Sequence, residues 1–150
     1  PGAVEEPRTT PPTRASDFQV GETYTHLFEL RGMVDGERVV FTVYFAGSAS
    51  NPDAGLPSAS VPPVDVAILT VPGWRNVSGY PEKFIERLKP QHIVLAHFDN
   101  FFDTSYESPE VVPTADLEGF LLQARQAATY PEFQQIWVPD VNARMRFTKD

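Results

Sequence analysis

In this 150-residue sequence, polar side chains come directly after apolar segments that read as strands. Open α/β proteins bind their ligands at such carboxyl ends of strands. The most informative of these residues is His97, because it ends an apolar run that begins at His92 and precedes Asp99 by two residues. An imidazole in that position can bind a metal ion or transfer a proton, and it can equally cap the strand by bonding to a loop carbonyl. Asp99 can support His97 or stabilise the turn.

Aromatic residues stand next to two of these strand ends. Trp74 and Arg75 follow a Pro-Gly turn, where they either line a pocket or pack as a lid over the edge of the core. Phe98, Phe101 and Phe102 follow the second strand end, and they predict either a hydrophobic plug or the lining of a site for an apolar substrate. Both alternatives stay open for each group.

Other candidate residues fit structural roles better. His92 stands at the start of its strand, and His26 lies mid-strand, so we expect both to pack or to lie at the surface. Asp65 begins a strand, where a loop-capping role is expected. The sequence contains no dinucleotide-binding, phosphate-loop, nucleophile-elbow or HExxH motif.

The pattern of apolar residues predicts a mixed α/β fold that positions these groups. Two early strands with a hairpin connection at residues 32–36 precede a strand–helix–strand unit, whose two apolar strands should be parallel. Thr114 is expected to cap a second long helix, with Asp116 and Glu118 in its first turn. The predicted strands are 23–30, 38–45, 64–71, 92–97, 136–138 and 143–147.

Composition limits the classes of function. The net charge of -8 disfavours a protein that binds a nucleic-acid backbone, and the absence of cysteine excludes disulfide scaffolds, zinc fingers and thiol catalysis. No apolar run is long enough to span a bilayer. Residues 1–17 contain four prolines and read as a linker or arm, so the folded domain is expected at 18–150.

Residues 64–73, 80–84 and 88–102, in that order, resemble the C-terminal half of metallo-β-lactamase-fold hydrolases. In that superfamily, a buried strand that begins with Asp leads through a helix to a strand that ends in a metal-binding His. The resemblance covers about residues 18–105. It implies an α/β (α+β) fold, with this chain forming the C-terminal half of an αββα sandwich as a mixed sheet flanked by helices.

The resemblance also implies roles for single residues. His97 takes the place of the last metal-binding His, and Asp99 that of an acid which often follows it, with a catalytic role. Ser48 stands where the superfamily usually has a metal-bridging Asp, which this sequence lacks. A subgroup of the superfamily with G-S-A-N at this position is similar. Trp74 and Phe98, with Ser48, are the expected substrate-binding residues. The implied cofactor is zinc, as one or two ions held mostly by residues that this sequence lacks.

The main ligand motif of the superfamily, H-x-H-x-D-H, does not occur in the sequence. Zinc sites need three or four protein ligands, so we expect the chain alone to be inactive and to work with the N-terminal half of the same fold as a separate or cleaved chain. The start at Pro1 agrees with a fragment, and an uncovered sheet face could also produce a homo-oligomer. The alternative is a non-catalytic binding module on a degenerate scaffold. An exported acidic surface protein is a third interpretation, based on charge and linker composition.

Overall fold

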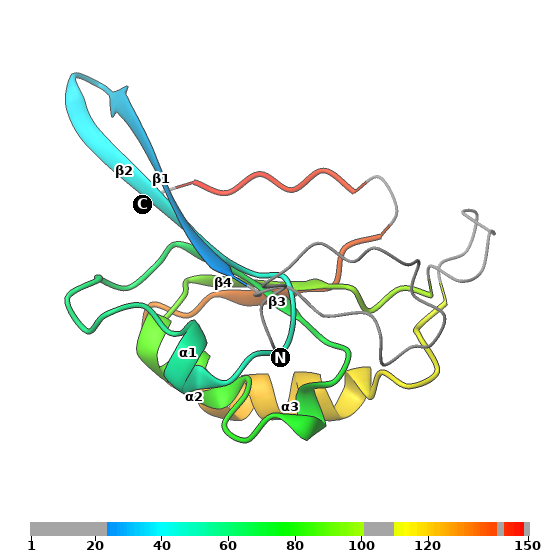
Figure 1. Cartoon of the computed structure of the whole chain (residues 1–150). Coiled ribbons are helices and arrows are strands. Elements are labelled where there is room, and N and C mark those ends of the chain that lie inside the picture. The colour runs from blue at the N-terminus through cyan, green and yellow to red at the C-terminus, as the bar shows by residue number, and fades with distance from the viewer. Residues whose placement is uncertain (1–23, 101–109, 141–142, 149–150) are drawn as a thin grey trace, which may run out of the picture.

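A five-stranded mixed sheet in the order β1-β2-β3-β4-β5 forms the centre of the structure, a computed structural model that describes residues 24–100, 110–140 and 143–148 (Figure 1). The β1–β2 pair is antiparallel, and β2 to β5 run parallel to one another. The strands are β1 (Thr25–Val34), β2 (Glu37–Ala46), β3 (Val66–Thr70), β4 (His92–Ala96) and β5 (Gln135–Trp137). The helices are α1 (Pro52–Gly55), α2 (Glu82–Leu88) and α3 (Leu117–Ala127), with a 3-10 helix at Trp74–Asn76.

The β1–β2 hairpin turns at Asp35 and Gly36, within the segment that the sequence indicates. Both residues have positive φ angles, 50° and 85°, as a two-residue type I′ turn requires, and Asp followed by Gly suits it. Both strands continue to the turn, so they are longer than the predicted ranges. The hairpin extends past the helices, because β2 pairs with β3 only from Val43 to Ala46 (Figure 1).

The strand–helix–strand unit that the sequence predicts is present as β3, α2 and β4, and its strands are parallel. Four of the five residues in each strand are buried, as expected of strands covered on both faces. Helix α2 ends at Leu88, and Lys89, with a left-handed φ of 41°, caps it before Pro90.

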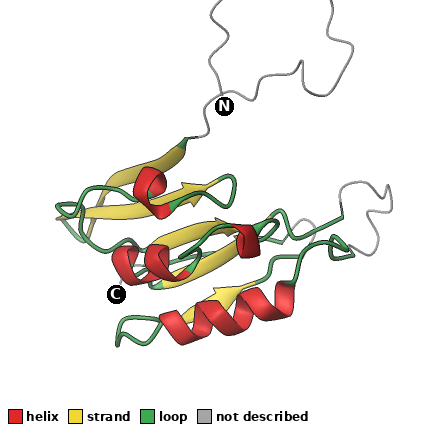
Figure 2. Ribbon diagram, turned by 60° about the horizontal axis from the view of Figure 1, so that its bottom comes forward, coloured by secondary structure: helices red, strands yellow, loops and turns green. Residues whose placement is uncertain are grey.

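All three helices cover one face of the sheet (Figures 1 and 2). The main core lies between this helix layer and the alternate strand residues that face it, such as Tyr44, Leu69 and Ile93. The largest contributions from the helix side are Phe84 and Phe120, together with Tyr80, which precedes α2; all three are fully or almost fully buried.

The second face of the sheet, turned away from the helices, is also largely apolar. Pairing aligns two rows of residues across it, and no described helix covers them. The first row is His26, Phe45, Ile68, Val94 and Trp137, and the second is Phe28, Val43, Val66 and His92.

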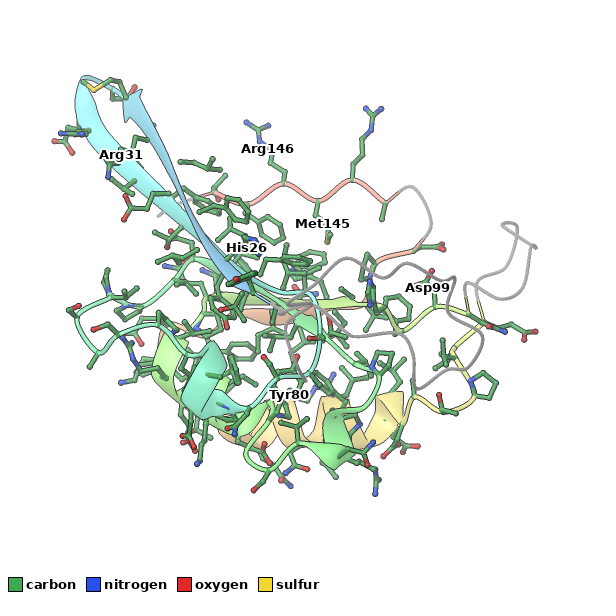
Figure 3. The ribbon with its side chains drawn as sticks, in the orientation of Figure 1. His26, Arg31, Tyr80, Asp99, Met145 and Arg146 are labelled. Carbon is green, nitrogen blue, oxygen red and sulfur yellow. The ribbon has the colours of Figure 1, made fainter. Side chains whose placement is uncertain are left out.

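Residues 143–148 cross the second face as an extended segment, so the prediction of a strand at 143–147 is wrong. Their alternation is nevertheless meaningful, because Phe147 contacts His92 and Trp137, while Arg146 points away from the sheet (Figure 3). The alternation of polar and apolar residues in this segment therefore reflects its contact with the face of the sheet. It does not indicate hydrogen bonding to a neighbouring strand among the described residues. The predicted linker at 1–17 lies outside the described residues.

The hydroxyl of Tyr44 connects β2 to α1, because it donates a 2.7 Å hydrogen bond to the carbonyl of Gly55. Burial raises the pKa of Tyr44 to about 12, and the side chain of Thr25 acts on it in the opposite direction. Burial also raises the pKa values of Tyr80 and Tyr130.

These tyrosines predict a loss of stability in alkaline solution. An unfolded tyrosine ionises near pH 10, below its folded pKa, so the stabilising contribution is complete below about pH 10 and disappears as the pH rises through the folded value. We expect the urea midpoint to fall between about pH 10 and 12, and to fall less in Tyr44→Phe. A midpoint that stays constant over this range in the unmodified protein would contradict the assignment.

Candidate functional site

The carboxyl ends of β3, β4 and β5 meet at one edge of the sheet, beside a hollow of about 320 Å³. We call it the strand-end hollow. Besides residues of β3 and β4, its lining includes His97, Phe98, Asp99, Pro139 and Asp140. The parallel pairing of β4 and β5 brings the last two residues next to a histidine more than 40 positions earlier in the sequence.

His97 is the first residue after β4, and its φ of 58° places it in the left-handed region. This conformation is uncommon for a residue with a side chain, although His adopts it more often than most. The imidazole is exposed at the rim of the strand-end hollow. It can therefore reach a ligand that enters from solvent.

Asp99 is held by backbone pairing with a distant segment. It forms an isolated antiparallel bridge with Val111, flanked by hydrogen bonds from Val112 N to the carbonyl of Phe98 (2.9 Å) and from Asn100 N to that of Glu110 (2.7 Å). Its side chain remains exposed, and Figure 3 shows it far from the hairpin tip. Both of its predicted roles, supporting His97 and stabilising the loop, are compatible with this position.

Phe98 both lines the strand-end hollow and packs against the main core. Phe98 therefore has features of both alternatives that the sequence leaves open, a hydrophobic plug and the lining of a site for an apolar substrate. Phe101 and Phe102 of the same predicted cluster lie outside the described residues.

Trp74 occupies a different part of the molecule, on the side that the helices cover. Its ring is 8% exposed and meets Phe120 edge to face, with ring centroids 5.9 Å apart. Its Nε1 donates a 3.0 Å hydrogen bond to the carbonyl of Asp116, and the guanidinium of Arg75 lies over the ring. The structure thus gives Trp74 a packing role, the second of its two alternatives, by which it holds the start of α3.

Asp116 is the residue that caps α3, so the prediction of Thr114 as the cap is wrong. The Asp116 carboxylate accepts a 3.0 Å hydrogen bond from Gly119 N and pairs with Arg75, whose Nε lies 2.7 Å away. Arg75 and the Gly119 amide lower the pKa of Asp116. Asp is a somewhat better cap than Thr by type, and Arg75 holds the second oxygen of the Asp116 carboxylate.

The other candidates lie apart from the strand-end hollow. Ser48 is in the loop between β2 and α1 and is partly buried. His92 is buried and packs against Trp137 and Phe147, in agreement with its expected structural role. His26 lies on exposed β1, stacked on the ring of Phe28 (Figure 3).

Asp65 has a structural role, as expected, but it fastens one strand to the next, whereas the sequence predicts a loop-capping role. It is 4% exposed, and one carboxylate oxygen accepts hydrogen bonds from the backbone N and the hydroxyl of Thr42, at 2.6 and 2.9 Å. These bonds fasten the start of β3 to β2, and they leave Asp65 far from the carboxyl ends of the strands.

Comparisons with protein-family models, with curated proteins and with solved structures find no match for this chain. Within the described ranges, no three His, Asp or Glu side chains gather closely enough to hold a metal ion. None of the helices that the structure describes has the length and apolar character to cross a membrane.

Sequence reasoning missed Asp140 as a site residue. The signal was present, because the strand at 136–138 was expected and ligands gather where parallel strands end. Its use requires that β5 lies next to β4 and parallel to it, a tertiary contact that the sequence pattern does not specify.

Proposed function

We propose that this chain is the C-terminal half of a metal-dependent hydrolase with a metallo-β-lactamase-type αββα sandwich, and that His97 is one of its metal ligands. The observation that carries the proposal is the position of His97, exposed at the end of a buried parallel strand and at the rim of a hollow that Asp99 and Asp140 also line. The resemblance of residues 64–102 to that superfamily supports the same assignment.

The donor groups at the strand-end hollow suit zinc by type. Imidazole nitrogen and carboxylate oxygen are both common zinc ligands, and His97, Asp99 and Asp140 offer them at this edge. These groups do not form a cluster of three ligands among the described residues, so we propose that a second polypeptide segment supplies the remaining ligands. Zinc, when bound, lowers the pKa of a bound water to about 7 and so supplies hydroxide as the nucleophile.

The chain's own residues hold and shape this part of the site. His97 has a left-handed backbone and an exposed imidazole, and the bridge at Asp99 fixes the loop that follows, so that Asp99 acts by orienting His97 or this loop. Phe98 forms an apolar wall of the hollow and anchors it to the core. We assign substrate contact to Phe98 rather than to Trp74 or Ser48, because only Phe98 lines the hollow.

The second face of the sheet is the proposed seat of the missing half. It consists of two apolar rows, crossed by residues 143–148 and free of described helices. A further hollow of about 1110 Å³ lies on this face between the hairpin and Arg146–Thr148, where Leu30 and Phe41 contribute to its lining. Val66 and Val94 are already buried, so a second sheet packed here would mainly bury the part of this face around β1, where Phe28 and Leu30 are exposed.

Native mass spectrometry of the protein isolated from its source tests the proposal. We expect a complex heavier than 16.7 kDa that releases a second polypeptide and one or two zinc ions on denaturation. His97→Ala should lose at least one zinc ion and its hydrolytic activity. Glu86→Ala, which removes an exposed carboxylate from α2 on the helix-covered side of the sheet, is the control and should keep both.

Two results would overturn the assignment. The first is a His97→Ala complex with unchanged zinc content and activity, which would exclude His97 as a ligand. The second is a metal-free species of 16.7 kDa or a zinc-free homo-oligomer, which would favour the alternative function.

That alternative is a non-catalytic binding module on the same scaffold. The hollow of about 1110 Å³ beside the hairpin favours it, because this hollow lies away from His97 and its lining includes Leu30, Phe41 and Phe147. Loss of partner binding on substitution of Phe41, with no effect of His97→Ala, would distinguish this function from hydrolysis.

A further inference from the structure

Strand β1 forms an edge of the sheet, and among the described strands it pairs only with β2. Its ten residues match β2 without a bulge and include no proline. Phe28, Leu30, Met33 and Val34 are large apolar side chains between 49% and 67% exposed. A long edge strand without a bulge or a proline is a template for another strand, and the charges of Glu29 and Arg31 limit which strand can pair with it.

The hairpin turn determines which backbone groups of β1 face outward. In a two-residue turn the closing pair, Val34 and Glu37, is the hydrogen-bonded kind, and such pairs alternate along an antiparallel ladder. The residues with odd numbers, Glu29 and Arg31 among them, therefore direct their N–H and C=O groups to the free edge. An incoming antiparallel strand must align with these residues.

The charges at the centre of β1 are complementary to themselves. Glu29 and Arg31 lie on the same face of the strand, form an ion pair at 2.5 Å and are both substantially exposed. If two copies of β1 meet with Leu30 opposite Leu30 of the partner subunit, each Glu29 faces Arg31 of the partner subunit, and two pairs of opposite charge result.

Neighbouring registers lack this match. A shift of two residues, the smallest that preserves the outward hydrogen bonds, places either Glu29 opposite Glu29 of the partner subunit or Arg31 opposite Arg31 of the partner subunit. Like charges directly opposite each other destabilise a strand pair. The charge pattern therefore selects one register.

The same register brings an aromatic ring over a glycine. Phe28 would lie opposite Gly32 of the partner subunit, and nothing lies within 4 Å of the position that a Cβ would take at Gly32. An aromatic side chain placed across from a strand glycine covers its exposed backbone. This contact occurs twice in a symmetric pair.

We propose that β1 pairs antiparallel with β1 of a second copy of this chain, with a two-fold axis at Leu30, to form one continuous ten-stranded sheet. The interface is isologous, because the same strand serves both subunits. It uses the free edge of the sheet and leaves the second face and the strand-end hollow unoccupied. It is therefore independent of the proposed hydrolase function.

Charge-reversed variants of the full chain test the pairing by sedimentation velocity. The wild type should form dimers with increasing concentration. Glu29→Arg alone and Arg31→Glu alone should each weaken the dimer by about tenfold or more, since each places like charges opposite each other twice. An equimolar mixture of the two variants should restore dimers, because only the heterodimer then pairs opposite charges.

The mixture separates this pairing from a structural effect within one chain. Both variants lose the internal Glu29–Arg31 ion pair, so recovery in the mixture can come only from contact between chains. Circular dichroism should show that both variants keep the fold, because both side chains are exposed. A wild type that stays monomeric, or a mixture that dimerises no better than its components, would overturn the proposal.

Discussion

Replacing Phe84 by alanine is expected to lower the free energy of unfolding by about 3–5 kcal/mol. The ring is fully buried and meets Tyr80 and Tyr44 at centroid distances of 5.2 and 5.9 Å. It also fills the space beside Gly55, where an added Cβ would lie 2.9 Å from it. Its removal therefore leaves a cavity between α1, α2 and β2, in addition to the lost burial.

Urea denaturation followed by circular dichroism measures this loss. It is a large part of the 5–15 kcal/mol that typical domains have, so the variant should be partly unfolded at moderate temperature. Leu122→Ala is the matched control, because Leu122 is 60% exposed on α3 and its loss should change stability by only about 0.5 kcal/mol. Equal stability of the two variants would show that Phe84 does not have this central position.

Replacing Asp65 by alanine is expected to cost about 3 kcal/mol, because it removes the charged acceptor of two short hydrogen bonds. The backbone N of Thr42 would lose its 2.6 Å partner at a site where Asp65 is almost fully buried. The start of β3 would then be joined to β2 by fewer bonds. Since β3 lies in the middle of the sheet, the loss should reduce the stability of the whole domain.

Asp65→Asn provides the graded comparison. The amide keeps one oxygen as an acceptor without the charge, so we expect a smaller loss, of about 1–2 kcal/mol. Thermal unfolding of the three proteins should rank them wild type, Asn and Ala in decreasing stability. An alanine variant as stable as the wild type would show that the Thr42 bonds do not contribute to stability.

Short-range patterns in the sequence predict most of the fold. The apolar runs that become β3 and β4 need burial on both faces, and the intervening helix follows from Phe84, Ile85 and Leu88 at helical spacing. Because a crossover of this kind joins parallel strands, the sequence also predicts their relative direction. These features depend on residues that are close in the chain.

Contacts between distant segments account for the differences. Residues 143–147 alternate as a strand does, but a strand also requires a neighbour with free backbone groups, which alternation does not supply. The cap of α3 depends on Arg75, 41 residues earlier. At the candidate site, His97, Phe98 and Asp99 were predicted from adjacency, whereas Asp140 joins them through the pairing of β4 with β5.

The left-handed backbone at His97 has a consequence for the variation that this position tolerates. Glycine adopts such a conformation freely, whereas a residue with a Cβ pays roughly 1–2 kcal/mol for it. Selection for thermostability alone would therefore favour glycine at position 97. Replacing His97 by glycine is therefore expected to stabilise the fold, while it removes the imidazole that the proposed site requires.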